Sequence, residues 1–318
     1  MISRPNISPK ISTLNCLTVD VEDYFQVSAF ADRVCRSDWD RYETRVEANT
    51  DRLLALFDEA EVQGTFFVLG WVADRHPELV RRIAAAGHEI ASHGYWHQLV
   101  YDLTPEEFAK DIEDSQDAIY NACGITVNAY RAPSFSIVPR SRWALEILRE
   151  KGITIDSSVF PVSWHDRYGD PDAPSEIHRI KTRSGWITEF PPTSGRINFG
   201  ITKFPLPIGG GYFRLLPLSL TELAINQVRS ETGPAMFYMH PWEVDPEQPR
   251  ISGLSLKSRF RHYVGLQRTE KKLKRLLGSV GFGPLKLFVD DWLITEENEF
   301  ASHDKLKLDS PESLTVKL

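Results

Sequence analysis

Short apolar stretches alternate with amphipathic helical patterns along most of this 318-residue chain, and this alternation limits the folds open to it. Periodicity and turn residues predict strands at 14–21, 65–69, 89–93, 128–131, 153–156, 187–190 and 235–239. Helices are predicted between them at 49–61, 77–86, from 104 onward, 141–149 and 218–229. This strand-then-helix order predicts an α/β fold whose parallel sheet is covered by helices and is either open or closed into a barrel.

Two segments that are rich in proline and glycine, 161–174 and 191–211, interrupt this alternation and are predicted to be long surface loops. Beyond Pro241 the pattern changes, and 257–275 carries many lysines and arginines along a helical pattern. We therefore expect an N-terminal lead at 1–13, a catalytic domain at 14–242, a C-terminal helical extension at 243–297 that is packed on or continuous with the sheet, and a polar, disordered tail at 298–318.

Composition excludes several classes of protein. The formal net charge of −7 argues against a nucleic-acid binder, which is usually basic. The chain lacks a run of about 18 apolar residues, so no membrane span is expected. Three scattered cysteines provide neither a disulfide framework nor a Cys-x-x-Cys site, which is typical of a reducing compartment. Because residues 1–15 also lack the apolar centre of a signal peptide, a cytoplasmic location is expected.

Side chains that are suited to catalysis lie at or just past the carboxyl ends of the predicted strands. They are Asp20, Glu22, Asp23, His93, His97, Arg131, Asp156 and His240. In parallel α/β folds the carboxyl ends of the strands lie at one edge, where active sites gather. We therefore expect these side chains to meet in one site, although Asp156 equally suits a helix N-cap.

The residue types in this set predict a hydrolytic metal site. His93 and His97 are four residues apart and can reach one ion from a single helical turn. Two histidines and one carboxylate leave an open position for water, as hydrolytic zinc enzymes require. The third ligand stays open: strand alternation places Glu22 on the same face as Asp20, whereas a bend at the strand end would present Asp23 instead.

Four motifs taken together resemble the polysaccharide deacetylases of the NodB-homology type, carbohydrate esterase family four. They are TVDVEDYF at 18–25, HGYWH at 93–97, YRAPSF at 130–135 and HPWE at 240–243. The resemblance covers roughly 14–242. It is closest to the branch associated with bacterial exosortase-linked exopolysaccharide loci, and 262–277 also looks similar to that branch.

The resemblance implies a distorted parallel (β/α) barrel of about seven strands. It also implies a divalent metal, usually zinc, that serves to hydrolyse N-acetyl groups from the amino sugars of a polysaccharide and to release acetate. By motif match, His93 and His97 are metal ligands. Asp20 is the general base and is held ionised by Arg131. His240 is the general acid.

Further roles follow from the same resemblance. Asp156 would position the general acid, and the backbone N–H near Ser134 would help to stabilise the tetrahedral oxyanion. Ser134 stands where an aromatic residue is common, so Phe135 and Trp96 are expected to shape the sugar subsite. Tyr212, in the glycine-rich stretch 209–213, is expected on a flexible substrate loop, although a simple turn explains that stretch equally well.

Two other functions remain open at this point. A relative could hydrolyse the C–N bond of a small linear or cyclic amide, or the chain could be a carbohydrate-binding scaffold without activity. A His-Glu-x-x-His metalloprotease is disfavoured because position 94 is glycine. The expected partner is a polysaccharide. The basic segment 257–275 is either a solvated helical face or a contact with an anionic polymer or the inner membrane surface.

Overall fold

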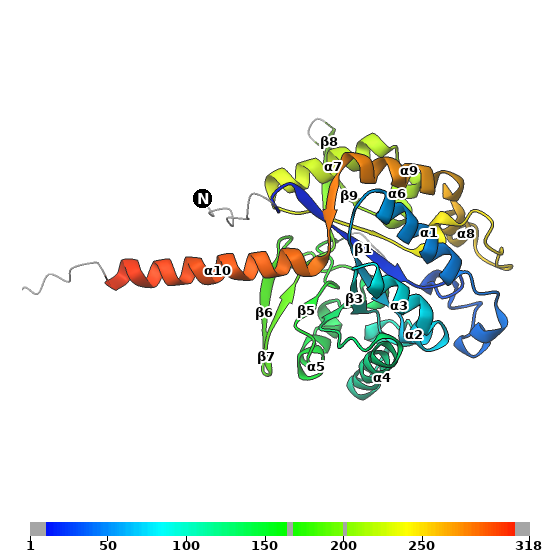
Figure 1. Cartoon of the computed structure of the whole chain (residues 1–318), viewed down its shortest axis with the longest axis horizontal. Helices are drawn as coiled ribbons and strands as arrows, with labels where there is room; N and C mark the ends of the chain where they lie inside the picture. The colour runs from blue at the N-terminus through cyan, green and yellow to red at the C-terminus, as the bar shows by residue number, and fades with distance from the viewer. Residues whose placement is uncertain (1–10, 164–167, 200–201, 309–318) are drawn as a thin grey trace, which may run out of the picture.

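The computed structural model describes residues 11–163, 168–199 and 202–308, and parallel strands form the centre of this part of the chain (Figure 1). The strands lie in the order β10-β1-β2-β3-β4-β5-β7-β6. Their bounds are β1 Leu14–Val21, β2 Thr65–Val68, β3 Glu89–Ser92, β4 Ala129–Tyr130, β5 Ile155–Asp156, β6 His178–Thr182, β7 Gly185–Glu189 and β10 Met236–Met239. Neighbours from β10 to β7 are parallel, and only β6 runs antiparallel. The predicted α/β fold with a parallel sheet is thus confirmed, as a distorted barrel that stays open between β10 and β6 in the described residues.

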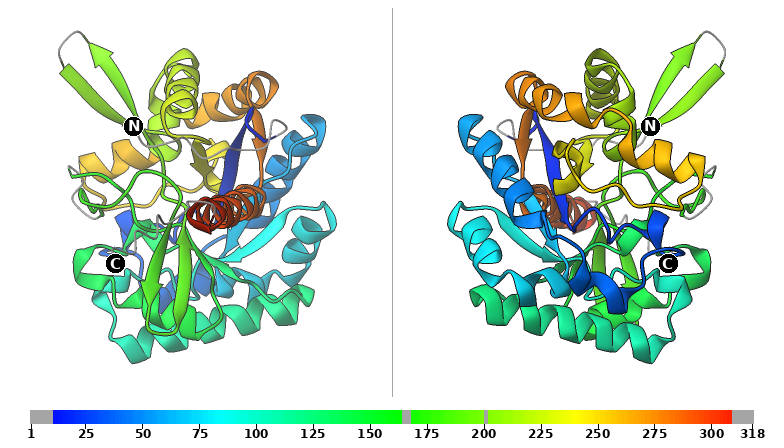
Figure 2. Two further views of the ribbon diagram at one scale, coloured as in Figure 1. Left: turned by 90° about the vertical axis from the view of Figure 1, so that its left-hand side faces the viewer. Right: turned by 90° about the vertical axis from the view of Figure 1, so that its right-hand side faces the viewer.

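Helices cover the outside of these strands (Figure 2). Those that follow the first four strands are α1 Val46–Glu59, α2 Gly70–Arg75, α3 Pro77–Ala85, α4 Pro105–Cys123 and α5 Ala144–Glu150. The later ones are α6 Gly210–Leu215, α7 Leu218–Glu231, α8 Leu256–Tyr263, α9 Leu266–Ser279 and α10 Leu285–Leu308. Short 3₁₀ turns lie at Ser28–Phe30, Arg36–Arg41, Val100–Asp102, Pro133–Phe135, Pro139–Ser141 and Pro241–Val244.

Local sequence explains the best-defined elements. Strand β1 is buried along almost its whole length, because a parallel strand covered on both faces is a continuous apolar run rather than an alternating one. Helix α4 begins at a capping box in which Thr104 accepts from the backbone of Glu107 and Glu107 accepts from that of Thr104. The helix ends at Gly124, whose φ of 74° suits glycine. The start of this helix was predicted from the sequence and is confirmed.

One predicted loop is not a loop. Within 191–211 the chain forms an antiparallel hairpin of β8 Ser194–Phe199 and β9 Thr202–Pro207, which stands away from the body in Figure 2. Prolines at positions 205 and 207 concealed this hairpin in the sequence. Edge strands tolerate proline, since an edge N–H needs no partner within the sheet. The other predicted loop, 161–174, is irregular where it is described, and its residues 164–167 lie outside the described part.

The C-terminal extension joins the sheet. Strand β11, Gly281–Gly283, pairs in parallel with the start of β1, and α9 buries leucines in the main core. Helix α10 then projects from the body and continues to Leu308 (Figure 1). The tail that was expected to be disordered from 298 therefore begins within a helix, and residues 309–318 lie outside the described part. None of the described helices is long and apolar enough to cross a membrane.

Candidate active site

A cavity of about 450 Å³ opens at the carboxyl ends of the central strands. Its lining includes Asp20, Glu22, His93, His97 and His240, which come from the ends of β1, β3 and β10. The register of these parallel strands explains the convergence, since β1 pairs with both β2 and β10 and β2 pairs with β3. Side chains that are far apart in the sequence thus face one cavity, as expected for residues at the carboxyl ends of parallel strands.

Three buried side chains form a group that could hold a metal ion. The ligand atoms of Glu22, His93 and His97 lie within 4.8 Å of one another, and His97 Nε2 is 2.6 Å from Glu22 Oε2. His93 Nδ1 lies 2.8 Å from the carbonyl oxygen of Arg131, so it carries the proton and donates it there. The lone pair of His93 is therefore on Nε2. Two imidazoles and one carboxylate are therefore close enough to bind the same ion.

The chemistry of these groups fits a divalent cation. Glu22 Oε2 is buried and accepts no hydrogen bond, while Oε1 accepts from the indole N–H of Trp242 at 3.1 Å. Burial opposes ionisation of Glu22, yet the charges of His97 and His240 outweigh it and lower the carboxyl pKa to about 2. Burial lowers the pKa of His93 to about 4, which keeps the imidazole neutral. An ionised carboxylate beside the neutral imidazole of His93 suits a divalent cation such as zinc.

The His93–His97 segment is a tight loop and not the helical turn that the spacing suggested. Gly94 has a φ of 73° and His97 one of 50°. The Asp111 carboxylate on α4 shapes this loop by accepting from the backbone N–H groups of Tyr95 and Trp96, at 2.9 and 3.0 Å. A Cβ at Gly94 would lie 2.6 Å from Asp111 Oδ2, so glycine is required there. Sequence reasoning missed Asp111, whose only signal was a carboxylate on the apolar side of a predicted helix.

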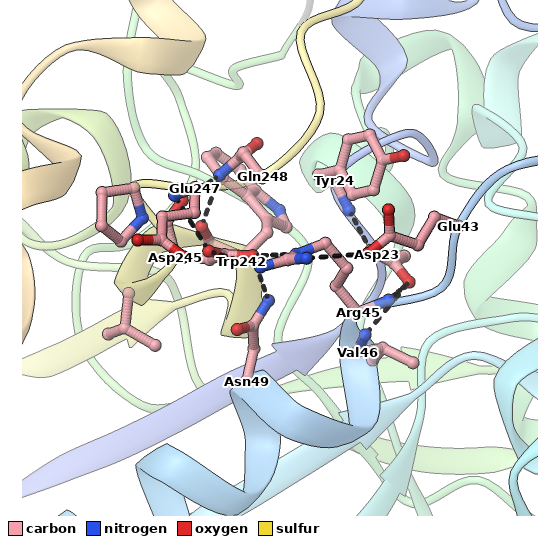
Figure 3. A network of polar contacts seen from close by, with 12 residues as sticks. Asp23, Tyr24, Glu43, Arg45, Val46, Asn49, Trp242, Asp245, Glu247 and Gln248 are labelled. Carbon is pink, nitrogen blue, oxygen red and sulfur yellow. Dashed lines mark hydrogen bonds and ion pairs between the residues drawn. The ribbon is translucent and has the colours of Figure 1, made fainter.

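Asp23 lies outside the metal group and performs a structural task (Figure 3). Its carboxylate accepts from the backbone N–H groups of Tyr24, Arg45 and Val46, at 2.8, 2.7 and 3.1 Å. Burial raises the pKa of Asp23 to about 6. The alternative that Asp23 is the third ligand is therefore wrong. The chain bends immediately after β1, where Glu22 N–H donates to Asp20 O, and this bend turns Asp23 toward the start of α1.

A buried ion pair holds the candidate base. Arg131 Nη1 lies 2.7 Å from Asp20 Oδ1 and also donates to Thr18 Oγ1 at 2.8 Å. Its Nη2 donates to Ser157 Oγ at 3.0 Å, and the guanidinium lies 4.2 Å above the ring of Phe67. The arginine is fully buried and fixed on several sides, so it holds the Asp20 carboxylate at the cavity in one orientation.

His240 faces this carboxylate across the cavity. Its Nε2 lies 3.9 Å from Asp20 Oδ2 and 3.8 Å from Glu22 Oε1, while Nδ1 donates to Glu243 Oε1 at 2.9 Å. Burial alone would lower the pKa of His240. The carboxylates of Glu22, Glu243 and Asp20 outweigh it and raise the pKa to about 9. The imidazole is thus protonated at neutral pH and presents an N–H to the cavity.

The prediction that Asp156 positions His240 is wrong. Asp156 is fully buried and accepts from Ser158 Oγ at 2.6 Å, and that oxygen in turn accepts from the backbone N–H of Ala132 at 2.8 Å. Asp156 thereby supports the segment after β4 rather than the general acid. Glu243 is the carboxylate that touches His240. Its signal in the sequence was its place three residues after His240 in the motif at 240–243.

Three of the four predicted substrate residues line the cavity. They are Ser134, Phe135 and Tyr212. Ser134 has a φ of 52°, and its hydroxyl lies 2.8 Å from that of Ser28. Tyr212 belongs to helix α6, so the flexible loop predicted at 209–213 is wrong. Trp96 does not line this cavity, so its predicted place in the sugar subsite is wrong. It lines a separate surface depression together with Arg36 and Gln98.

Two family models match this chain. Residues 38–155 match the model described as polysaccharide deacetylase, and residues 157–290 match one described as a domain of unknown function (DUF3473). Asp20 and Glu22 precede both matches. His240, Glu243 and helix α8 lie within the second.

Individual proteins resemble the chain over shorter stretches. A chitooligosaccharide deacetylase from Rhizobium leguminosarum bv. trifolii is 39% identical over 74 residues, which cover 23% of this chain and 34% of that protein. A peptidoglycan-N-acetylglucosamine deacetylase from Bacillus cereus is 28% identical over 116 residues, or 36% of this chain and 41% of that protein. The chain thus spans less than half the length of these two relatives.

One solved structure shares the overall fold. It comes from Mycobacterium smegmatis and is provisionally assigned as a polysaccharide deacetylase. It superposes with a TM-score of 0.59 at 20% sequence identity and covers 100% of this chain and 99% of its own. At this level of identity, the likeness shows the fold.

Proposed function

We propose that this protein is a metal-dependent N-deacetylase of the NodB-type polysaccharide deacetylase family. The match over residues 38–155 and the curated relatives support this proposal. The protein would hydrolyse the N-acetyl group of an amino-sugar residue in a polysaccharide and release acetate. The observation that carries this proposal is the placement of a metal-binding group, a carboxylate paired with arginine, and a protonated histidine around one cavity.

Glu22, His93 and His97 would hold the divalent ion, for which we propose zinc. Bound there, the ion would acidify a water molecule and polarise the acetamide carbonyl. Asp20 is placed by Arg131 to take the proton from the attacking water. His240 Nε2–H faces the same space and donates its proton to the departing amine nitrogen as the tetrahedral species collapses.

The polymer itself is a finer proposal. The relatives are described as acting on chitooligosaccharide and on peptidoglycan, both of which carry N-acetylated amino sugars. Because four motifs resemble the exopolysaccharide-locus branch, we propose a bacterial exopolysaccharide as the substrate. The cavity of about 450 Å³ is bordered by the exposed Leu215 and Phe260, which leaves it accessible to a polymer chain. The cytoplasmic location stays a prediction from the sequence.

The decisive test is acetate release by the purified chain from N-acetylated oligosaccharides and from exopolysaccharide. We expect release that a chelator abolishes and that added zinc restores. Metal binding without release from any polymer would contradict the proposal and favour a small amide as substrate. A chain that neither binds metal nor releases acetate would instead be a binding scaffold.

Changing Glu243 to glutamine should move the alkaline limb of the activity profile to lower pH. His240 must be protonated to act as the acid, and the negative charge of Glu243 helps to raise its pKa to about 9. Removing a charge that contacts the ring should lower that pKa by about 1 to 3 pH units. The measurement is kcat against pH for both proteins. Asp156→Asn is the matched control, and its alkaline limb should stay in place; a shift with Asp156→Asn alone would restore the motif-based assignment.

A further inference from the structure

We propose that helix α8 docks the protein onto an anionic membrane surface, with the catalytic cavity beside the point of contact. Leu256 and Phe260 lie one turn apart on α8 and are 84% and 59% exposed. Leu215, at the end of α6, is 51% exposed, and it lines the cavity together with Phe260. Large apolar side chains are therefore exposed to water at the mouth of the cavity. In Figure 1, α8 lies at the opposite end of the molecule from the projecting α10.

The same helix is strongly cationic. Lys257, Arg259 and Arg261 are all exposed, and the eight residues of α8 include no acidic side chain. This local positive charge contrasts with the formal net charge of −7 for the whole chain. Cations that flank exposed leucine and phenylalanine are typical of helices that lie in the interface of an anionic bilayer.

Helix α8 is firmly attached to the catalytic residues. Its one buried side chain, His262, stacks on Trp242 at a centroid distance of 4.2 Å, and Trp242 stacks on His240 at 5.2 Å. The guanidinium of Arg214 donates to backbone carbonyls at 261, 262 and 264. A surface that contacts α8 is thus held in a defined position relative to His240.

Within the basic segment expected at 257–275, α8 is the part of the described chain that combines cations with exposed large apolar side chains, because the leucines of α9 are buried. In α9, Lys272 donates to the backbone carbonyls of Phe213 and Leu216, and Lys274 pairs with Glu59. Lys272 thus ties α9 to the end of α6, whereas the exposed pair of Lys274 with Glu59 adds little to stability. An acidic polymer in water would gain little from the exposed Leu256, whereas a bilayer would bury it, so the apolar part of α8 favours lipid.

This docking gives the proposed deacetylase access to polysaccharide that is held at a membrane, and in that respect it rests on the proposed function. The contact itself is independent of catalysis. A cavity whose mouth faces the lipid surface would receive a chain that is anchored there.

The test is sedimentation of the full chain with vesicles of phosphatidylcholine, with and without phosphatidylglycerol. We expect binding to the anionic vesicles that weakens as salt is raised. Leu256→Glu and Arg259→Glu should each lower this binding by about tenfold or more, because each loses a favourable contact and adds a repelled charge. Neither residue lines the cavity. Matched controls are Leu223→Glu, at a leucine that is 54% exposed on α7, and Lys110→Glu on α4.

Two results would overturn the docking proposal. One is that the wild type does not bind anionic vesicles, or that the α8 variants and their controls lose this binding to the same extent. The other is binding to a soluble acidic polysaccharide, rather than to vesicles, that the α8 variants abolish. Acetate release from soluble oligosaccharides should be unchanged in both α8 variants. If the wild type binds vesicles through α8 but releases no acetate, the docking stands and the proposed function fails.

Discussion

Replacing Asp20 with asparagine should abolish acetate release while the divalent ion stays bound. The amide cannot accept the proton of the attacking water, and loss of a general base typically costs a factor of about 10²–10⁴ in rate. The amide oxygen can still accept from Arg131 Nη1, which is now 2.7 Å from Asp20 Oδ1, so the fold should be retained. The measurement is kcat together with metal content for the same preparation.

Metal content separates this role from its alternative. If the Asp20→Asn protein loses its metal, Asp20 is a ligand and the role of base is wrongly assigned. Ser28→Ala provides a matched control, because it removes a different hydrogen-bonding group from the cavity lining and leaves the Asp20–Arg131 pair intact. We expect it to retain metal and to keep more activity than Asp20→Asn.

Glu22→Gln should weaken metal binding, whereas Asp23→Asn should lower the stability of the fold, although the two residues are adjacent. Removing a residue that only hydrogen-bonds to a metal ligand typically lowers metal affinity by about 10–100-fold. Removing the ligand carboxylate of Glu22 itself should therefore lower the affinity further. Asp23→Asn should leave metal affinity unchanged. It should instead lower the free energy of unfolding by about 2 kcal/mol, because an amide cannot accept from Tyr24, Arg45 and Val46 together.

Zinc titration and denaturant unfolding of the two variants provide the measurements. Weaker zinc binding by Asp23→Asn, with its stability intact, would reverse the assignment of the two carboxylates. Equal zinc affinity in Glu22→Gln and the wild type would exclude Glu22 as a ligand.

Much of the fold was predictable because its signals are local. Strand β1 was predicted at its observed bounds, since a run of buried residues followed by carboxylates is a clear pattern. The capping box at Thr104 marked the start of α4. The hairpin β8–β9 was missed because proline within a strand imitates the pattern of a loop.

The sequence predicted many of the residues of the candidate site but few of the contacts that position them. The ends of parallel strands meet, so Asp20, His93 and His240 could be placed together from sequence order alone. Their partners could not. Asp111 acts from α4 on the backbone of the preceding loop, and the placement of Trp96 depends on that loop.

The sequence by itself determined which chemical groups stand at the ends of the strands, and therefore that a metal-binding group, a carboxylate and a histidine share one edge of the sheet. Only the tertiary structure decided that Glu22 rather than Asp23 enters the cavity and that Glu243 rather than Asp156 contacts His240. The physical reason is that both choices depend on how the chain turns after a strand: it bends directly after β1, and it forms the 3₁₀ turn Pro241–Val244 after β10. Periodicity records the strand, whereas the direction of such a bend is set by hydrogen bonds to distant backbone.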